Sequence, residues 1–495
     1  MKQPITLIIP PSVFLADERV FPSLGLARVA ACLEKREYPV EILDLSGVRN
    51  FTEVSEGYAL STRTDIFCLT LTTPQLPAAS LIVKAMRKVK KEAKFIAGGP
   101  HCTTTLAAVK MEKKLGVARR GHRAWQQLED IFDVTVAGDG EEAVFLAIEK
   151  DAPRLIDADD PDSFMFLKDY QLADYPFPAR HLLDIHSYKY EIDGHPSTSI
   201  ISQLGCPYLC SYCSARFSPS FRRVRLRDSD NVALEMETIY RQFGFTGFQF
   251  YDDELGLVPS FTQDMQKIIN LQDRLGVEFR MRGFIKANLF NETYAKLMYK
   301  AGFRQVCVGS ESGSDKILVN INKKATKKDN SECIRMAHDN GLSIKCFCSI
   351  GHAGEDERSV YDTRDWLIEA KPDDFDMTVI TCYPGTPYHD LAIPGDRNGE
   401  WVYTAKNGDR LYSVEVDFAL DPAYYKGIPG GGYKSFVWTD SIPREKMVEL
   451  RDEIEKDVRV SLGIPFCSVK PGSSFEHSMG QGFPRSILRS SSDTV

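Results

Sequence analysis

The chain has 495 residues, of which 43% are hydrophobic and 26% charged, and its formal net charge at pH 7 is −8. This is the composition of a soluble globular protein long enough for about two to four domains. Nucleic-acid binding depends on neutralising phosphates, so the acidic balance disfavours a nucleic acid as partner and favours a small molecule or a protein. No apolar run approaches the ~20 residues that cross a bilayer, and the first residues carry no signal-peptide pattern. The sequence predicts a cytoplasmic protein with no membrane partner.

Residues 1–150 alternate short apolar segments with amphipathic helical patterns. The periodicity predicts helices at 24–36 and 78–93, and strands at 5–11, 40–46, 65–72, 94–100 and 133–141. Several of these strands end in Gly, Pro, Asp or Ser, as in parallel sheets whose functional loops follow the strands. The pattern predicts a doubly wound, Rossmann-like α/β domain. The charged segment 111–130 reads as a solvated surface insertion.

A connector rich in Asp and Pro, residues 151–197, leads to a second α/β series in residues 198–391. Pro restricts the backbone, so regular elements in the connector should be short. Six strands alternate with helices in the second series, which implies parallel strands with right-handed crossovers. The strands are expected at 198–204, 247–253, 277–283, 303–312, 342–350 and 374–383. Six units fall short of the eight that close a full barrel, so we expect an open, partial (β/α)6 barrel.

The pattern changes in residues 392–495, where Gly, Pro and Tyr interrupt the periodicity. We expect residues 392–440 to cap the barrel mouth and residues 441–460 to form a helix, with Ser441 and Pro443 as its start signals. Beyond Pro465 the chain is rich in Ser and Gly, which predicts a poorly ordered end.

Three of the twelve cysteines stand out by their spacing. Cys206, Cys210 and Cys213 form C-x3-C-x2-C directly after the first strand of the barrel series, at the end of the strand where this architecture places chemistry. Thiolates select zinc, copper(I) or iron–sulfur clusters. Structural zinc takes a fourth Cys or His at short spacing, which this loop lacks. A four-iron cluster held by three thiolates instead leaves one iron open to a cofactor or substrate.

The C-x3-C-x2-C spacing, with the aromatic Tyr212 before the last cysteine, resembles the signature of the radical S-adenosylmethionine (SAM) enzymes, whose fold is the partial (β/α)6 barrel. The resemblance implies that the three cysteines bind a [4Fe–4S] cluster and that its open iron chelates SAM. One electron from the cluster then splits SAM to yield a 5′-deoxyadenosyl radical. A family member also needs an electron donor such as flavodoxin or ferredoxin as a partner.

The segment FYDDELG, residues 250–256, stands where that family usually carries a Gly-Gly-Glu motif for the SAM amino group. Asp252, Asp253 and Glu254 supply oxygen acceptors there, which suit an ammonium-like donor. Because acids replace both glycines, it stays open which of the three makes the contact.

Two further segments resemble SAM-binding motifs of the family. VGSESGS, residues 308–314, resembles the segment at the SAM ribose and carboxylate. SIGHAGED, residues 349–356, resembles the turn near the adenine, although His352 and Ala353 replace the expected Leu-Pro. The candidates for SAM binding in these two segments are Ser310, Glu311, Ile350 and Gly351.

The first 150 residues resemble the cobalamin-binding-type domain that precedes the barrel in one branch of the family. Gly98, Gly99 and Gly138 at strand ends would let a macrocycle or nucleotide tail approach the backbone. Many cobalamin proteins supply a histidine to cobalt from an Asp-x-His-x-x-Gly motif, which these residues lack, as that branch often does. The alternative is an α/β domain that binds nothing, because fold alone does not fix a ligand.

The resemblance therefore implies a cobalamin-binding radical SAM enzyme, with methylation of an unactivated carbon or phosphorus of a small-molecule substrate as the favoured reaction. One alternative is a radical cyclase, isomerase or dehydratase in which cobalamin is absent or is not the methyl donor. A tRNA methylthiotransferase would need a second set of clustered cysteines, whereas Cys32, Cys68 and Cys102 are spread over separate elements. A non-catalytic iron–sulfur or zinc module is opposed by the three SAM-like segments.

Overall fold

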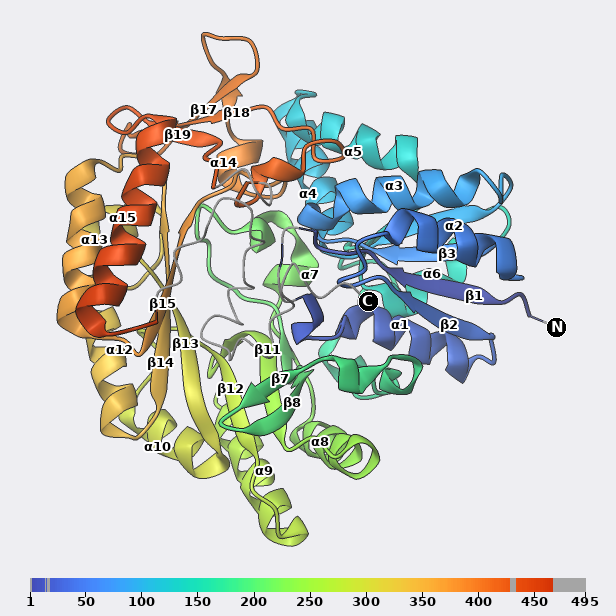
Figure 1. Cartoon of the computed structure of the whole chain (residues 1–495), viewed down its shortest axis with the longest axis horizontal. Helices are drawn as coiled ribbons and strands as arrows, with labels where there is room; N and C mark the ends of the chain where they lie inside the picture. The colour runs from blue at the N-terminus through green and yellow to red at the C-terminus, as the bar shows by residue number, and fades with distance from the viewer. Residues whose placement is uncertain (1, 14, 16–17, 428–432, 466–495) are drawn as a thin grey trace.

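The computed structural model describes residues 2–13, 15, 18–427 and 433–465, so the Ser- and Gly-rich end from residue 466 lies outside the described residues. Two α/β units lie side by side, the first drawn in blue and cyan and the second from green to orange (Figure 1). Among the described residues, no helix combines the length and the apolar character needed to cross a membrane.

The first unit is built on a six-stranded parallel sheet in the order β2-β1-β3-β4-β5-β6. Its strands are β1 (Ile5–Ile9), β2 (Val40–Asp44), β3 (Ile66–Thr70), β4 (Lys94–Gly98), β5 (Val134–Gly138) and β6 (Leu155–Ala158). Apolar side chains fill both faces of the sheet. One face packs against α1 (Leu24–Lys35) and α6 (Gly140–Ala147), and the other against α2 (Phe51–Ser61), α3 (Leu76–Arg87), α4 (Pro100–Leu115) and α5 (Arg120–Ile131). The doubly wound α/β prediction is confirmed.

The connector contributes one strand to each of the two large sheets. β6 pairs in parallel with β5, while β7 (Tyr190–Ile192) pairs antiparallel with β8 (His195–Ile200) of the barrel. The β5–β6 pairing brings Gly138 so close to the next strand that a Cβ on it would lie 2.3 Å from the backbone of Ala158. β6 and β7 could not be predicted from the sequence, because strands of four and three residues carry too little periodicity.

The charged segment 111–130 forms the end of α4 and most of α5, and Lys113, Lys114 and Arg123 are exposed, as its composition predicted. Two of its charged residues are buried instead. Glu112 is 1% exposed, and its carboxylate accepts hydrogen bonds from three backbone N–H groups around the start of α5. Arg120 is 3% exposed and donates to the Ser413 hydroxyl and the Val414 carbonyl. These charges are buried because one caps a helix and the other binds the C-terminal region.

The second unit is a partial barrel of six parallel strands, with β7 added antiparallel at one edge. After β8 come β11 (Gly247–Leu255), β12 (Arg280–Ile285), β13 (Phe303–Glu311), β14 (Ser343–Ile350) and β15 (Asp374–Val379). The helices between them are α8 (Ser229–Phe243), α9 (Phe261–Leu275), α10 (Glu292–Ala301), α11 (Asp315–Asn320), α12 (Lys327–Asp339) and α13 (Glu357–Ala370). One large apolar core joins strands and helices. The partial (β/α)6 barrel is confirmed.

The C-terminal region closes the open side of the barrel. A small antiparallel sheet is formed by β16 (Ile393–Pro394), β17 (Glu400–Thr404), β18 (Arg410–Val414) and β19 (Val437–Thr439). It reaches the turn after β14, because a Cβ on Gly351 would lie 2.9 Å from the Val437 side chain. The expected C-terminal helix is α15 (Arg444–Leu462), which packs against α13 and β15.

Candidate cofactor site

The three cysteines lie on a loop held at both ends by the backbone. The loop leaves β9 (Gln203–Leu204), which pairs with β10 (Arg225–Leu226), and ends at the short helix η6 (Ser214–Phe217). Gly205 has a φ of +86°, and a Cβ on it would lie 2.1 Å from the Arg223 carbonyl oxygen, so the turn requires glycine. The Cys206 N–H donates a 2.9 Å hydrogen bond to the Phe221 carbonyl. The loop is therefore a fixed platform after the first barrel strand.

The thiols are enclosed but lie beside two cations. Cys210 is buried and Cys206 half-buried, and burial raises the pKa of Cys206 to about 11. The Lys286 ammonium interacts electrostatically with both thiols, and the Lys323 ammonium interacts with Cys210. Lys286, which is 4% exposed, donates 2.7 Å to the Lys323 carbonyl and lies 4.5 Å from the centre of the Tyr208 ring. The surroundings suit a group that carries negative charge.

The loop offers a donor set of three thiols. Among the described residues, no three His, Cys, Asp or Glu side chains are grouped so that they could hold a single metal ion. A four-iron cluster takes one thiolate per iron, so its three ligands stand apart, whereas one zinc ion draws four ligands to about 2.0–2.3 Å. The donor set of Cys206, Cys210 and Cys213 fits the cluster.

The three acids at the end of β11 have separate roles. Asp252 accepts hydrogen bonds from the backbone N–H and the hydroxyl of Ser202, and Asp253 accepts 2.7 Å from the Gly205 N–H. Both acids thus hold the strand that leads into the cysteine loop. Glu254 differs, because its Oε1 is buried without a hydrogen-bond partner among the described residues. Burial raises the pKa of Glu254 to about 8, against the opposing charges of Lys323 and Lys286.

Glu311 connects the cysteine loop to the far strands of the barrel. It ends β13 with a φ of +63°, and its Oε1 accepts hydrogen bonds from the Tyr212 hydroxyl at 2.6 Å and from Lys323 Nζ at 3.0 Å. The Ser349 hydroxyl donates to the other carboxylate oxygen at 3.0 Å. Burial alone would raise the pKa of Glu311, but the Lys323 ammonium and the Tyr212 hydroxyl hold it below its usual value. Glu311 is therefore an anion fixed by three donors.

The other candidates near Glu311 belong to the frame of the site. Ser310 and Ile350 are fully buried, and the Ser310 carbonyl accepts a 3.1 Å hydrogen bond from the Asn330 amide. Gly351 has a φ of +97°, and its N–H donates to the Glu355 carboxylate. The structure thus encloses the side chains of Ser310 and Ile350 in the core.

Sequence reasoning missed three polar side chains of this site. Lys286 follows β12 directly, Lys323 follows α11, and Ser349 lies one residue before the end of β14. His352 is fully buried, 2.9 Å from the Ser349 hydroxyl and 3.3 Å from the Tyr388 hydroxyl. Lys286 and Ser349 could have been predicted from their positions, because polar residues at strand ends in this architecture point to the site. Lys323 follows a helix and gave no such signal.

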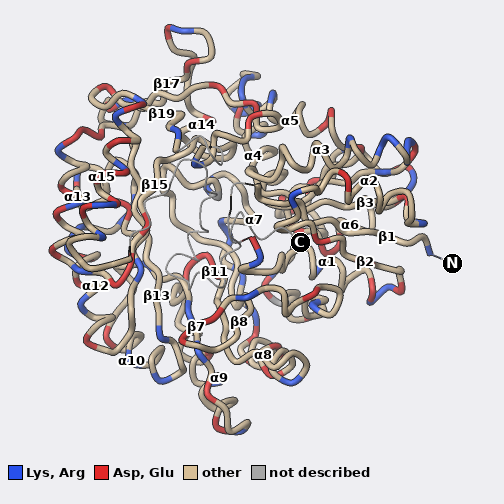
Figure 2. Tube along the Cα trace, in the orientation of Figure 1, with Lys and Arg blue, Asp and Glu red and all other residues tan. Residues whose placement is uncertain are grey.

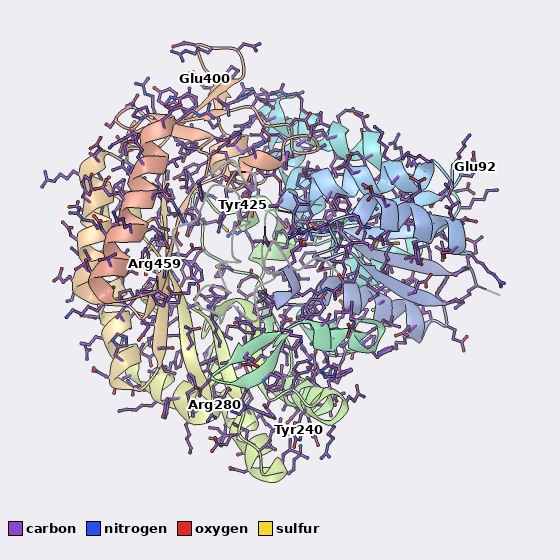
Figure 3. The ribbon with its side chains drawn as sticks, in the orientation of Figure 1. Glu92, Tyr240, Arg280, Glu400, Tyr425 and Arg459 are labelled. Atoms are coloured by element: carbon purple, nitrogen blue, oxygen red, sulfur yellow. The ribbon has the colours of Figure 1, made fainter. Side chains whose placement is uncertain are left out.

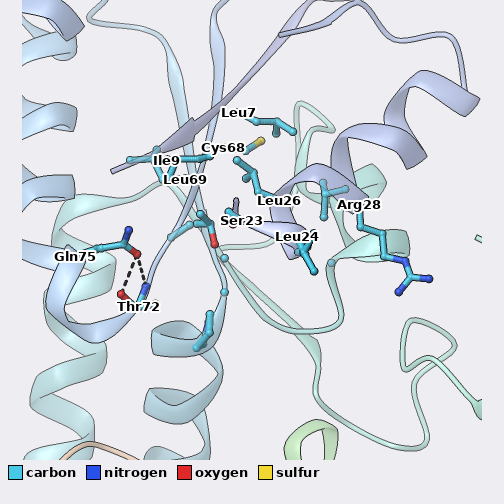
Figure 4. A pocket seen from close by; sticks show the side chains of 18 of the residues that line it. Leu7, Ile9, Ser23, Leu24, Leu26, Arg28, Cys68, Leu69, Thr72 and Gln75 are labelled. Atoms are coloured by element: carbon cyan, nitrogen blue, oxygen red, sulfur yellow. Dashed lines mark hydrogen bonds between the residues drawn. The ribbon is translucent and has the colours of Figure 1, made fainter. Parts of the chain in front are cut away.

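A cavity of about 820 Å³ lies between the two units, within the size range of ligand pockets. Its walls are largely apolar and come from the strand ends of the first sheet, with Leu7, Ile9 and Leu69 among them (Figure 4). The barrel side contributes Ser214, directly after Cys213. Tyr425, from the C-terminal region, also lines the cavity and lies between the two halves of the molecule (Figure 3).

The three predicted glycines all line this cavity but for different reasons. A Cβ on Gly98 would meet nothing within 4 Å, so this residue leaves open space. Gly99 and Gly138 have φ values of +97° and +92°, and a Cβ on either would lie within 3 Å of neighbouring backbone atoms. No histidine lines the cavity in the part of the chain that the structure describes.

The cysteines of the first unit do not form a second site. Cys68 and Cys102 are both buried, but they belong to the two cores on opposite faces of the sheet. The sheet itself separates their thiols, so they cannot ligate one cluster together. This arrangement opposes the methylthiotransferase alternative.

Comparison with known proteins shows which family the barrel resembles. Residues 200–367 match the model of the Radical SAM superfamily, so the partial barrel is a radical SAM domain and the protein is an enzyme. The uncharacterized methyltransferase PH0819 of Pyrococcus horikoshii is 26% identical over 79% of this chain and 83% of its own length.

Two further matches differ in how much they cover. An anaerobic magnesium-protoporphyrin IX monomethyl ester cyclase of Rubrivivax gelatinosus is 28% identical over 38% of this chain, which spans 33% of the length of that relative. The structure of the radical SAM methyltransferase TsrM from Kitasatospora setae, with cobalamin and a [4Fe–4S] cluster bound, has a TM-score of 0.60 at 18% identity and covers 82% of this chain and 81% of its own. This last likeness shows that the two chains share a fold.

Proposed function

We propose that the protein is a cobalamin-dependent radical SAM methyltransferase that acts on an unactivated carbon or phosphorus of a small molecule. The observation that carries the proposal is the cavity, which extends from Gly98 and Gly138 in the first unit to Ser214 beside Cys213. A ligand that fills it contacts both the cobalamin-type domain and Ser214, which directly follows Cys213. The fold shared with TsrM, which is described with cobalamin and a [4Fe–4S] cluster, supports the same assignment.

In this proposal Cys206, Cys210 and Cys213 hold the cluster. When bound, the cluster supplies one electron to SAM and cobalamin carries the methyl group. The Glu254 carboxylate oxygen, buried without a partner, suits the SAM ammonium, because an ammonium is best met by a carboxylate. Glu311 is already fixed as an anion and offers an acceptor to the SAM ribose. The buried Lys286 and the half-buried Lys323 offset the negative charge of the thiolates.

The cavity suits cobalamin bound without a protein ligand to cobalt. Its walls are mainly apolar, and no histidine lines it among the described residues. The open space at Gly98 gives a large flat ligand direct access to the backbone. The barrel residues Ile201, Leu204 and Tyr251 also line the cavity.

The proposed reaction also needs a low-potential electron donor, such as flavodoxin or ferredoxin. A reducing compartment keeps the thiols available for a cluster, so we assign the protein to the cytoplasm. The eight other cysteines within the described residues are all buried and unbridged, as expected for reduced core residues.

Cofactor analysis tests the proposal directly. After anaerobic reconstitution with iron, sulfide and hydroxocobalamin, we expect about four iron and four sulfide per chain and a stoichiometric amount of cobalt. The combined variant Cys206→Ala, Cys210→Ala, Cys213→Ala should lose the iron and sulfide but keep the cobalt, since the cavity lies outside the loop. Cys32→Ala, a buried cysteine of α1, is the matched control and should keep both. Zinc in the loop, or no cobalt after reconstitution, would refute the proposal.

A second candidate is a radical cyclase, which the match to the magnesium-protoporphyrin ester cyclase favours. SAM labelled in its methyl group separates the two reactions. In methyl transfer, one SAM passes its label to the product and leaves S-adenosylhomocysteine, and the SAM that forms the radical leaves 5′-deoxyadenosine and labelled methionine. A cyclase forms only 5′-deoxyadenosine and labelled methionine, and its product carries no label.

A further inference from the structure

The outer side of the cysteine loop is positively charged, although the chain as a whole carries a net charge of −8. Residues 205–227 contain five arginines and no Asp or Glu. Two of the five, Arg225 and Arg227, are buried and paired with acids in the interior. The other three, Arg216, Arg222 and Arg223, are partly or fully exposed, and basic segments are visible beside α7 (Pro219–Arg222) in Figure 2.

A second basic segment packs against the same loop. The Asn322 amide donates 2.7 Å to the Leu209 carbonyl, and the Ser211 N–H donates 2.9 Å to the Ile321 carbonyl. These bonds bring the turn after α11, with the exposed Lys324, alongside the cysteine loop.

These surface cations are not neutralised by neighbouring acids. Within the described residues, no carboxylate lies within 4.0 Å of the charged groups of Arg216, Arg222, Arg223 or Lys324. Two of them bind the loop itself, because Arg216 donates 2.8 Å to the Leu209 carbonyl and Arg222 donates 3.4 Å to the Pro207 carbonyl. Arg223 and Lys324 are the exposed members of this set, and Arg216 and Arg222 are half-buried.

The centre of this surface is apolar. Leu209, between the ligand residues Cys206 and Cys210, is 36% exposed, and Val319 of the adjacent α11 is 77% exposed. An apolar centre with a charged rim is the usual anatomy of a protein interface. The 820 Å³ cavity is lined by Ser214 but by none of these residues, so the surface is separate from the proposed substrate and cobalamin site.

We propose that this surface, the basic face, docks a small acidic electron-transfer protein. We define the basic face by Leu209, Arg216, Arg222, Arg223, Val319 and Lys324. The inference rests on the proposed function, because only a cluster on Cys206, Cys210 and Cys213 needs an external electron. The donor gives up one electron from its prosthetic group and is oxidised, and the oxidised cluster is reduced by that electron. No covalent bond forms between the proteins.

Position and charge both favour this occupant. Electron transfer slows steeply with distance, and the exposed Leu209 lies between two of the three cluster ligands in the chain. Opposite charges on the two proteins steer their encounter and orient the donor. A small anionic substrate would instead use the 820 Å³ cavity, which buries more of its surface.

The test compares two variants with the same change of charge. Arg223→Glu/Lys324→Glu reverses two charges of the basic face, and Lys150→Glu/Lys300→Glu reverses two exposed lysines elsewhere that have no ion pair among the described residues. Flavodoxin is the probe. Its binding in the oxidised state is measured at low and high salt on protein with and without the cluster, and its reduced state is mixed with loaded enzyme to follow cluster reduction.

We expect the basic-face variant to bind flavodoxin at least about tenfold more weakly at low salt, with the difference fading at high salt. Cluster reduction by flavodoxin should slow by a similar factor. The control variant should match the wild type, and the charge-retaining Arg223→Lys/Lys324→Arg should keep binding. Dithionite should reduce all four loaded proteins to the same final extent, which verifies that the site is intact.

Equal flavodoxin binding and reduction rates in the basic-face variant and the wild type would overturn the inference. Binding of single-stranded RNA is measured on the same proteins. If the basic-face variant loses RNA binding that the wild type shows, while its flavodoxin binding is unchanged, the inference is also overturned, since the face would then recognise phosphates. Failure of the proposed function is a different result: the protein would hold no iron after reconstitution, while the binding measured without the cluster would still report on the basic face.

Discussion

The Tyr212 hydroxyl donates a 2.6 Å hydrogen bond to Oε1 of Glu311, across 99 residues of sequence. Tyr212 directly precedes Cys213, and Glu311 ends the strand β13. The bond therefore ties the cysteine loop to the middle of the barrel sheet. Because Lys323 and Ser349 donate to the same carboxylate, the position of the loop and the anion at the end of β13 depend on each other.

Tyr212→Phe keeps the ring but removes the hydroxyl that binds Glu311. A hydrogen bond to a charged group contributes about 1.5–3 kcal/mol, so we expect the Kd for SAM to rise by roughly tenfold or more while iron content stays unchanged. Equilibrium dialysis with labelled SAM measures the Kd. Tyr208→Phe is the control, because the Tyr208 hydroxyl makes no hydrogen bond to the described residues. If Tyr212→Phe binds SAM as tightly as the wild type, Glu311 is not part of the SAM site.

Binding of SAM should release a proton from Glu254. Burial raises the pKa of its carboxyl to about 8, so at pH 7 most of the free enzyme holds Glu254 protonated. An arriving ammonium favours the carboxylate and lowers that pKa. Titration calorimetry at pH 7 in buffers of different ionisation enthalpy should therefore detect release of nearly one proton. The release should diminish above pH 8, where Glu254 is already ionised.

Glu254→Gln should abolish this proton release and weaken SAM binding. Asp253→Asn is the matched control, since Asp253 holds the Gly205 N–H and an amide oxygen can still accept that bond. Proton release that persists in Glu254→Gln would assign the titrating group elsewhere.

Strong periodicity made most of the fold predictable, whereas the site needed three-dimensional information. The six barrel strands lie where periodicity placed them, because each contributes apolar side chains to the core. The C-x3-C-x2-C spacing identified the cysteine loop because its three ligands lie within eight residues of sequence. The choice of Glu254 over Asp252 could not be predicted, because it depends on Ser202, 50 residues away, occupying Asp252. The burial of Glu112 was hidden for a similar reason, since its partners lie on the next helix.

Two glycines of the first unit should respond differently to added side chains. Gly98→Val places a branched side chain in the open space of the cavity, so we expect weaker cobalamin binding with little change in the melting temperature. Gly138→Ala meets backbone at 2.3 Å with a φ of +92°, so we expect a lower melting temperature instead. Thermal unfolding without cofactor and spectroscopic titration with hydroxocobalamin measure the two effects. Unchanged cobalamin affinity in a folded Gly98→Val protein would place cobalamin outside this cavity.

Glu112→Gln should destabilise the first unit at neutral pH. Both oxygens of the buried carboxylate accept backbone hydrogen bonds from the start of α5. Gln replaces one oxygen with an NH2 group that cannot accept, so at least one buried donor is left unsatisfied at a cost of about 1–3 kcal/mol. Burial alone would raise the pKa of Glu112, but these hydrogen bonds hold it below its usual value. The stabilisation is then present above the unfolded-state pKa of about 4.3 and is lost as the pH falls through the folded-state pKa. Melting temperatures at pH 7 should fall in Glu112→Gln, the difference from the wild type should shrink below pH 4, and the half-buried Glu129→Gln should match the wild type throughout. A difference that stays constant down to pH 3 would mean that the charge of Glu112 does not cap α5.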